Sequence, residues 1–591
     1  MAGLQEFIHK IELGEGAKVI KWITVILGFV GLAVAYDIQE QQCFVNPEAM
    51  EAGQLARNLA EGRGYSTHFI RPLSMQLIQQ RRGDNDALIK TAHPDLATPP
   101  LYPVLLAGLM KVAPFQWDIP RETTFFHYQP EIVIAVANQV LFMLAIWLVY
   151  CLGKRMFDAF VGGLSALIMA GSLLFWRFSV SGLSTMLLVV IFLGLVWGLA
   201  RLEQGTREPQ HGGFWFLFWS AVVGGLTALG GLTRYAFAWM IIPVVAFLVL
   251  FFPQRRFFMT LAALTVFIGL MAPWITRNYQ VSGTFFGTAG YAAAQDTTLA
   301  LQSTRLERSL GEELDKVSQL ELQDYSKKLL INASQIVQND LPRLGGNWIS
   351  GLFLVGLLVA FNSPTVARVR YFLLMSLLLM VVVQAIGRTH LSTLVPDVNS
   401  ENLLVVLAPL VFLYGVSLYS VLVDQIEVAF PRATAAISTF VLAVASLPLI
   451  LVFLPPKSFP VVYPPYFPPL IQQIGGWYNE DELTMSDMPW AVAWYGGRDC
   501  LWYTQNPQEA FFKINDFQKP VKALYLTQLS LDGKFQSQLV KGDDRPWGRF
   551  ALEVLLTSKV PSGFPLRTAL SVILPEQILL ADRERWNVPE K

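Results

Sequence analysis

Long stretches of apolar residues recur along this 591-residue chain. Each stretch is close to the roughly twenty residues that a helix needs to cross the hydrocarbon core of a bilayer. The sequence therefore predicts a mostly α-helical, polytopic membrane protein of about eleven spans. The expected spans lie near 19–36, 131–152, 159–179, 181–200, 213–232, 235–252, 257–275, 347–362, 371–387, 402–423 and 433–454.

Lysine and arginine residues fall on alternate connections between these spans. Cytoplasmic loops of membrane proteins are enriched in both residues, so their placement orients the chain. With the N-terminus inside, the expected cytoplasmic positive residues are Lys18, Lys21, Lys154, Arg155, Arg201, Arg207, Arg255, Arg256, Arg368 and Arg370. The same orientation places the connections 37–130, 276–346 and 388–401, and the region after about 455, on the outer face of a cell inner (plasma) membrane.

The region after the last span differs in composition from the rest of the chain. It opens with a proline-rich linker that includes Tyr463 to Pro469, and such linkers are extended and stiff. We expect short strands at Trp490–Tyr495, Leu501–Tyr503 and Val521–Leu526. The predicted parts are a cytoplasmic amphipathic N-terminus over 1–18, a transmembrane domain over 19–454 and a small extracytoplasmic α/β domain over 455–591.

Composition excludes some classes of function. Hydrophobic residues make up 53% of the chain and charged residues only 15%, whereas soluble domains are about a quarter charged. The formal net charge of +0 excludes a basic protein that binds nucleic acid. The cysteines, Cys43, Cys151 and Cys500, lack the spacing of a disulfide framework or a metal site. A pairing of Cys43 with Cys500 is left open.

The connection 37–130 is far longer than a simple link between two spans. Long loops with structure of their own usually carry function. Near its start, Pro47 suits the first position of a helix, and Glu48 and Glu51 follow closely. A carboxylate just outside the membrane can act as a general base for an acceptor hydroxyl or amine. The alternative is that both glutamates only stabilise the N-terminus of the helix.

Arginines on the expected outer face form a second group of candidates. They depart from the enrichment of positive charge on the inner face, and a phosphate matches the forked donors of arginine. The alternatives are snorkelling to the interface and pairing with a carboxylate. The members of this group are Arg57, Arg71, Arg234, Arg277 with the neighbouring Asn278, and Arg388.

The connection before the 402–423 span is polar. Ser392 to Asn402, a stretch that includes Glu401, could line a pocket for a lipid phosphate or a sugar, or it could cap the next helix. The chain has no glycine-rich phosphate loop, so a nucleotide substrate has no support. No metal site is predicted from histidine spacing, although the acidic residues leave a divalent cation open.

Five short stretches in a fixed order resemble a known family. They are Pro47-Glu48 with Leu55 to Tyr65, Pro99 to Pro103, Asn138 with Leu152 to Arg155, Leu232 to Arg234, and Pro273 to Asn278. Over roughly residues 15–455 the chain resembles the GT-C superfamily of polytopic glycosyltransferases that use lipid-linked sugars. Within it, the chain is similar to the branch of the bacterial protein O-mannosyltransferases and the lipid A aminoarabinose transferases.

The resemblance implies an inverting transfer, at the outer face of the bilayer, from a polyprenyl-phosphate sugar donor to an acceptor that is a protein, a lipid or a polysaccharide. Glu48 stands where the family typically has an aspartate and is the expected base, with Asp37 second and Glu51 contributing. The expected substrate-binding residues are Arg57, Tyr65, Asp95, Tyr102, Arg234, Arg277, Asn278, Arg388 and Glu401.

Two other functions remain open. A non-catalytic subunit on the same scaffold would bind the lipid carrier without moving a sugar, and the glutamate in place of an aspartate is the reason to keep this hypothesis. A transporter would need ionisable residues in the middle of its spans. The expected spans contain almost none, so transport ranks last.

Overall fold

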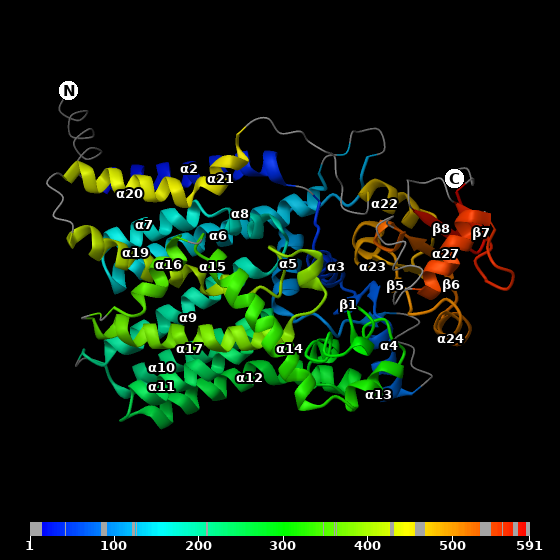
Figure 1. Ribbon diagram of the computed structural model, residues 1–591, viewed down its shortest axis with the longest axis horizontal. Helices are drawn as coiled ribbons and strands as arrows, with labels where there is room; N and C mark the ends of the chain where they lie inside the picture. Colours follow the sequence, from blue (N-terminus) through cyan, green and yellow to red (C-terminus); the bar gives the residue numbers. More distant parts are fainter. Residues whose placement is uncertain are drawn as a thin grey trace.

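The computed structural model describes residues 15–586 except for 42, 84–91, 121–124, 126, 209–210, 347, 360, 362, 426–430, 455–466, 532–544, 558 and 571–576. The long helices run along the long axis of the molecule, and the C-terminal region lies at one end of them (Figure 1). Most of the expected N-terminal segment 1–18 and of the proline-rich linker falls outside the described residues.

Seven helices in the described part of the chain are long and apolar enough to cross a membrane. They are α2 (Glu15–Glu40), α6 (Gln129–Met156), α9 (Thr185–Gly205), α10 (Gly213–Thr233), α12 (Arg256–Ser282), α17 (Pro364–Gly387), and η6 (Leu403–Leu407) continued by α19 (Ala408–Gln425). An eighth results if α7 (Ala159–Ala170) and α8 (Leu173–Val180), which meet at a bend of 56°, count as one span. The prediction of a polytopic helical membrane protein is confirmed.

The other expected spans are shorter or interrupted helices. The window 235–252 is η2 (Tyr235–Met240) followed by α11 (Ile241–Phe251), and 347–362 contains α16 (Trp348–Gly356). The last window is divided into α20 (Pro431–Ala445) and α21 (Leu447–Val452). Pro448 explains this last break, because proline lacks the N–H that would continue the hydrogen-bond ladder of α20. Apolar runs of similar length thus form both continuous and broken helices.

The connection 37–130, called the first outer loop after its expected side of the membrane, folds into short elements. They are α3 (Pro47–Ala60), β1 (Ser66–Thr67), β2 (Phe69–Ile70), α4 (Pro72–Arg82), β3 (His93–Pro94) and α5 (Leu101–Val112). Pro47 begins α3 at a position where no N–H is needed. All side chains of α3 from Ala49 to Ala56 are buried, Glu51 included. Protein therefore encloses α3 on most of its sides, which is unusual for a helix of a connecting loop.

The connection 276–346, expected as the second outer loop, is also largely helical, whereas the connection 388–401, expected as the third, has one short helix. The second contains η3 (Gly287–Tyr291), η4 (Leu299–Leu301), α13 (Glu312–Ser318), α14 (Leu322–Gln335), η5 (Ile336–Asp340) and α15 (Leu341–Arg343). A capping box of Glu321 and Asp324 starts α14 by satisfying backbone N–H groups of its first turn. The third loop contains α18 (Leu391–Leu394).

The C-terminal region is an α/β layer built on a six-stranded sheet with the order β2-β5-β4-β6-β8-β7. Its strands are β4 (Leu483–Ser486), β5 (Cys500–Trp502), β6 (Val521–Leu526), β7 (Thr568–Leu570) and β8 (Ile578–Ala581), and its helices are α22 (Pro468–Gly476), α23 (Pro489–Ala491), η7 (Val492–Gly496), α24 (Glu509–Phe517), α25 (Gln528–Leu531) and α27 (Arg545–Thr557). In this order, β2 with β5, β5 with β4, and β4 with β6 pair in parallel. Strand β8 pairs antiparallel with β6 and β7.

The strand expected at Trp490–Tyr495 is wrong, because this segment forms α23 and η7. Pro489 stands in the first turn, where proline favours a helix. Gly497, with φ of 60°, ends the helical segment in the left-handed conformation that glycine adopts most easily. The strands expected near Leu501–Tyr503 and at Val521–Leu526 are confirmed as β5 and β6.

The sheet joins the first outer loop to the C-terminal region. Strand β2 pairs in parallel with β5, with Phe69 opposite Cys500, and the N–H of Cys500 donates to the carbonyl of His68 at 2.8 Å. The predicted division near residue 455 therefore does not coincide with the edge of this sheet. Cys43, Cys151 and Cys500 are all free thiols, so the pairing of Cys43 with Cys500 does not form.

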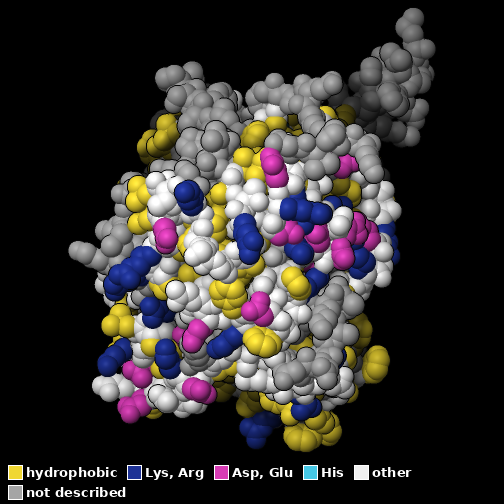
Figure 2. Space-filling model, turned by 90° about the vertical axis from the view of Figure 1, so that its right-hand side faces the viewer, with side chains coloured by type: hydrophobic (Ala, Val, Ile, Leu, Met, Phe, Trp, Pro, Cys, Tyr) yellow, Lys and Arg dark blue, Asp and Glu magenta, His cyan; other side chains and the backbone are white. Residues whose placement is uncertain are grey.

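The end that carries the C-terminal region and the sides of the long helices have different surfaces. At the end that carries the C-terminal region, acidic and basic side chains lie close to one another (Figure 2). Along α2 and α12, by contrast, large apolar side chains such as Leu27, Phe258 and Ile268 are exposed. Apolar helix surfaces of this kind suit contact with lipid, whereas the mixed charges suit water.

Close packing between α3 and η7 makes Gly53 sensitive to substitution. A Cβ added at Gly53 would lie 2.9 Å from the Trp494 ring, and that ring is fully buried. We expect Gly53→Ala to lower the free energy of unfolding by about 1–3 kcal/mol through overpacking. Thermal unfolding of the purified protein in detergent measures the change.

The matched control is Gly108→Ala in α5, where an added Cβ meets nothing within 4 Å. It should be neutral or stabilising by up to about 1 kcal/mol, because alanine favours a helix over glycine. Equal effects of the two substitutions would contradict the packing of α3 against η7.

Candidate active site

Glu48 lies in the first turn of α3, at the junction between the membrane helices and the outer region. The Ser400 hydroxyl donates a hydrogen bond to the Glu48 carboxylate. Burial raises the pKa of Glu48 above its usual value of 4.5, while the positive charge of Arg234 and the hydrogen bond from Ser400 oppose this shift and the charge of Glu401 adds to it. A carboxylate with a raised pKa accepts a proton more readily than an ordinary one.

Arg234 is the cation whose charge lowers the pKa of Glu48. It follows α10 directly and has an extended backbone, with φ of −148° and ψ of 123°. Burial lowers its pKa, and Glu48 and Glu401 raise it. Across the described part of the chain, its guanidinium makes no hydrogen bond and no ion pair within 4.0 Å. Arg234 is half-buried, and a guanidinium with unused donors in such a place is suited to bind an anion.

The third outer loop holds Ser400 and Glu401 in place through its own polar contacts. Glu401 is buried and accepts from the N–H of Thr389 at 3.1 and 3.0 Å. The side-chain oxygen of Asn399 accepts from the N–H groups of Glu401 and Asn402, each at 3.0 Å. This loop therefore presents Ser400 to Glu48 from a fixed backbone.

Arg277 belongs to a second cluster, in which it is bound to protein. Its guanidinium donates to the carbonyl of Asp95 at 2.5 Å and to Asn278 Oδ1 at 3.0 Å. It also lies 4.9 Å from the centre of the Trp274 ring and 5.6 Å from that of Tyr65. The structure thus places Tyr65, Asp95, Arg277 and Asn278 together, with the donors of Arg277 largely used.

The Asp95 carboxylate is buried and accepts from the N–H of Thr98 at 2.8 Å. Burial, and then the charge of Glu51, raise the pKa of Asp95 to about 7, against the opposing effect of Arg71. Asp95 therefore titrates near neutral pH, which makes it the second candidate for a proton acceptor after Glu48.

Glu51 is bound by an arginine, unlike Glu48. Arg71 donates to its two oxygens at 2.5 and 2.9 Å, and the Nε of Arg71 donates to Glu307 at 3.0 Å. This carboxylate–guanidinium–carboxylate group joins the first and second outer loops. With both oxygens occupied, Glu51 is better placed to hold the loops together than to accept a proton.

Two other expected site residues, Asp37 and Arg57, are bound to side chains other than Glu48. Asp37 accepts from Gln139 of α6 at 2.6 Å. Arg57 pairs with Glu61 at 3.0 Å and covers Trp117. Arg57 is nine residues beyond Glu48, about 13 Å along the axis of α3.

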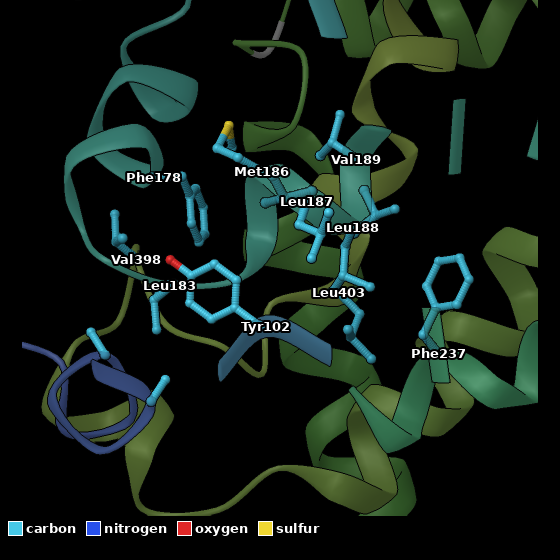
Figure 3. Close-up of a cluster of buried hydrophobic side chains, with 14 of the residues drawn as sticks. Tyr102, Phe178, Leu183, Met186, Leu187, Leu188, Val189, Phe237, Val398 and Leu403 are labelled. Atoms are coloured by element: carbon cyan, nitrogen blue, oxygen red, sulfur yellow. The ribbon is translucent and has the colours of Figure 1, made fainter. Parts of the chain in front are cut away.

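Tyr102 is surrounded by buried apolar side chains (Figure 3). Its hydroxyl donates to the carbonyl of Gly182 at 2.9 Å and is also bound to Asn138 at 3.1 Å. Tyr102 is therefore a buried link between α5 and the membrane helices. Of the expected residues, Glu48, Arg234 and Glu401 form one electrostatic group.

Sequence reasoning missed Glu131, a fully buried carboxylate at the start of α6. It accepts from the N–H of Phe44 at 2.9 Å, the Trp494 indole at 2.8 Å and the Tyr495 hydroxyl at 2.6 Å. The sequence shows only an acidic residue at the edge of an expected span. Its donors are separated from it by 87 to 364 positions, so no local pattern could reveal them.

Glu131 binds the segment that precedes Glu48 in the chain, through the N–H of Phe44. Phe44, which it holds, lies four residues before Glu48 and packs against Gly182, where an added Cβ would come within 2.4 Å of the ring. The same carboxylate holds two residues of η7.

The described residues contain no group of three or more His, Cys, Asp or Glu able to hold a metal ion.

Comparison with known proteins identifies the scaffold. Residues 115–276 match the family described as dolichyl-phosphate-mannose-protein mannosyltransferase. The matched segment runs from before α6 into α12 and includes Arg234, but it ends before the third outer loop. No curated protein matches the chain in sequence.

Solved structures of membrane proteins are similar to this chain at low sequence identity, and two of those below reach a TM-score of 0.50 or more. The oligosaccharyltransferase AglB from Archaeoglobus fulgidus, in complex with an inhibitory peptide and a dolichol-phosphate, is 11% identical, with a TM-score of 0.51 over 95% of this chain and 74% of that chain. The apo form of that enzyme gives 10% identity and a TM-score of 0.50 over 87% and 70%. ArnT from Cupriavidus metallidurans bound to undecaprenyl phosphate is 11% identical, with a TM-score of 0.41 over 96% of this chain and 99% of that chain.

The family match and the AglB fold together confirm the prediction of a GT-C scaffold. The chain is a polytopic membrane protein that shares its fold with the oligosaccharyltransferase AglB.

Glu131 should be important for stability. We expect Glu131→Ala to lower the free energy of unfolding by about 1–3 kcal/mol, because three buried donors lose their acceptor. Denaturant or thermal unfolding in detergent measures the loss. Glu131→Gln retains one acceptor oxygen and should lose less, so a larger loss in the glutamine variant would contradict this role.

Proposed function

We propose that this protein is a membrane glycosyltransferase that moves a sugar from a polyprenyl-phosphate-linked donor to an acceptor on the outer face of a cell's plasma membrane. The observation that carries the proposal is the group formed by Glu48, Arg234 and Glu401, in which a half-buried guanidinium with unused donors acts electrostatically on a carboxylate with a raised pKa. The dolichol-phosphate in the AglB complex supports a lipid phosphate as the ligand.

Arg234 is the proposed binder of the donor phosphate. Its forked guanidinium matches two phosphate oxygens at once. Arg71 and Arg277 are already bound to protein atoms, whereas the Arg234 guanidinium has no such partner among the described residues. When the phosphate leaves the sugar, the positive charge of Arg234 would stabilise the charge that develops on the leaving oxygen.

Glu48 is the proposed general base. It takes the proton from the acceptor hydroxyl or amine while the acceptor atom attacks the anomeric carbon. The bond from that carbon to the phosphate oxygen breaks, and the polyprenyl phosphate departs with the bonding electrons. Attack from the face opposite the phosphate inverts the anomeric centre through an oxocarbenium-like transition state. In this scheme Arg234 stabilises the leaving phosphate and Glu48 activates the attacking acceptor.

Replacement of Glu48 by glutamine tests the catalytic role. We expect Glu48→Gln to slow transfer by about a hundred- to ten-thousandfold, because an amide does not accept the proton. Transfer of labelled sugar from lipid-linked donors in membranes that contain the protein measures the rate.

The control for this test is Glu61→Gln at the other end of α3, where Glu61 forms a surface pair with Arg57. It should change the rate little, because exposed ion pairs contribute little. Full transfer by Glu48→Gln would exclude Glu48 as the base. The alternative, a non-catalytic carrier-binding subunit, predicts an unchanged cellular phenotype in this variant.

The pH dependence of transfer tests the electrostatic link between Glu48 and Arg234. A base must be ionised, so the rate should rise with pH through the pKa of Glu48, which burial raises above its usual 4.5. The positive charge of Arg234 lowers that pKa. We therefore expect Arg234→Gln to move the acid limb of the single-turnover pH profile to higher pH.

A control for the limb position is Arg63→Gln, because Arg63 is a partly exposed residue beyond the C-terminal end of α3 that pairs with Glu61. Its profile should keep the limb of the unmodified protein. If the acid limb of the pH profile does not move in Arg234→Gln, or moves equally in both variants, the proposed interaction of Arg234 with Glu48 is contradicted.

A further inference from the structure

Ser400 of the third outer loop binds one oxygen of the proposed base. Its hydroxyl donates to Oε1 of Glu48. In the part of the chain that the structure describes, no residue other than Ser400 donates a side-chain hydrogen bond to Glu48. Oε2 of Glu48 is therefore the oxygen that remains to accept a proton. Ser400 is itself buried, so the surrounding protein leaves its hydroxyl few other partners.

Glu401 closes the third outer loop. Its two carboxylate oxygens accept from the N–H of Thr389 at 3.1 and 3.0 Å, and one of them also accepts from the Thr389 hydroxyl. Both residues are buried, and hydrogen bonds to an ionised group are stronger than those between neutral groups. With both oxygens bound to Thr389, Glu401 is better placed to shape the loop than to bind a substrate.

The backbone around Ser400 is fixed by Asn399. Its Oδ1 accepts from the N–H groups of Glu401 and Asn402, each at 3.0 Å, and its Nδ2 donates to the carbonyl of Val395 at 2.8 Å. An asparagine side chain that binds the backbone two residues ahead sets a turn. The turn determines the direction in which the Ser400 side chain leaves the loop.

The segment 399–402 is anchored at both of its ends. Val398 and Leu403, which flank it, belong to one cluster of buried hydrophobic side chains (Figure 3). Gln384 of α17 also accepts from the N–H groups of Leu403 and Leu404 at 3.1 and 3.3 Å. Ser400 therefore keeps one position relative to Glu48, which stands on a different element, α3.

Ser400 and Glu401 affect Glu48 in opposite directions. Burial raises the pKa of Glu48, and the charge of Glu401 adds to this shift. The positive charge of Arg234 and the hydrogen bond from Ser400 lower the pKa, because both favour the ionised carboxylate. Arg234 at the end of α10 and Glu401 in the third outer loop are the charged groups that act on Glu48.

We propose that Ser400, Thr389 and Glu401 are positioning residues for the transfer: Ser400 holds Oε1 of Glu48 so that Oε2 faces the acceptor, and the contact of Thr389 with Glu401 keeps Ser400 in place. The inference rests on the proposed function, in which Glu48 is the base. A base must lie within hydrogen-bond distance of the proton that it takes, and small displacements of a catalytic group slow a reaction strongly.

The test is the pH profile of single-turnover transfer in membranes that contain the full-length protein. The donors are undecaprenyl phosphates that carry labelled mannose, galactose or N-acetylglucosamine. Ser400→Ala should move the acid limb to higher pH by about one unit, because Glu48 loses a donor that favours its ionised form. The rate above the limb should fall about tenfold. Ser400→Thr keeps the hydroxyl and should restore most of both.

Thr389→Val removes the hydroxyl of Thr389 and keeps its N–H. The limb should move in the same direction as in Ser400→Ala, by a smaller amount. Because Thr389 acts through Ser400, the double variant should match Ser400→Ala alone. The matched control is Thr393→Val in α18 of the same loop, where the exposed Thr393 donates to the carbonyl of His390 at 2.6 Å. It should keep the profile of the unmodified protein.

Glu401→Gln separates this role from general damage to the loop. The amide removes the negative charge and retains an oxygen that accepts from the Thr389 N–H. The limb should therefore move to lower pH, opposite to its movement in Ser400→Ala. The inference is overturned if Ser400→Ala leaves the limb in place, if Glu401→Gln moves it to higher pH, or if the shifts of Thr389→Val and Ser400→Ala add in the double variant.

The titration of Glu48 can also be followed without a donor. Infrared difference spectra of the purified protein against Glu48→Gln record its carboxyl band as a function of pH, and the same shifts should appear in that band. If Glu48→Gln transfers sugar at the full rate, the proposed base is wrong and the inference fails with it. If Glu48→Gln is slow, and neither the limb nor the band shifts in Ser400→Ala, the inference alone fails.

Discussion

The burial of Glu131 is the constraint on which the arrangement of the outer region depends. A carboxylate placed in a protein interior must be surrounded by donors, and here these come from the segment before α3 and from η7 of the C-terminal region. The same contact brings Trp494 against Gly53 of α3, while β2 of the first outer loop completes the sheet at β5. Glu48 thus stands on a helix that the membrane domain and the C-terminal region hold jointly.

The arginines of the expected outer face differ in what they bind, and this difference supports the separate roles proposed for them. Arg71 joins two loops through Glu51 and Glu307, and Arg277 is held by the Asp95 carbonyl and two aromatic rings. The guanidinium of Arg234 is half-buried and has no such partners in the described structure. A substrate phosphate would accept hydrogen bonds from the unused donors of Arg234, whereas Arg71 and Arg277 would have to give up existing contacts.

The sequence was sufficient for the seven long membrane helices, because an apolar run of about twenty residues leaves few alternatives. It did not show that the windows 235–252, 347–362 and 433–454 form shorter or broken helices. It also placed Glu48 and Arg234 on the same side through the alternation of positive charge. It did not reveal Glu131 or the pairing of β2 with β5, since both depend on contacts between residues hundreds of positions apart. The strand predicted at Trp490–Tyr495 is wrong, because an apolar run this short does not distinguish a strand from a helix. The segment is helical, with Pro489 in its first turn and Gly497 at its end.

The most direct test of the account is an experimental structure of the protein with undecaprenyl phosphate in a lipid nanodisc. The account predicts that the phosphate lies within hydrogen-bond distance of the Arg234 guanidinium, in a cavity that the Glu48 carboxylate also lines. A phosphate bound by Arg57 or Arg277, with Arg234 and Glu48 remote from it, would contradict the central claim.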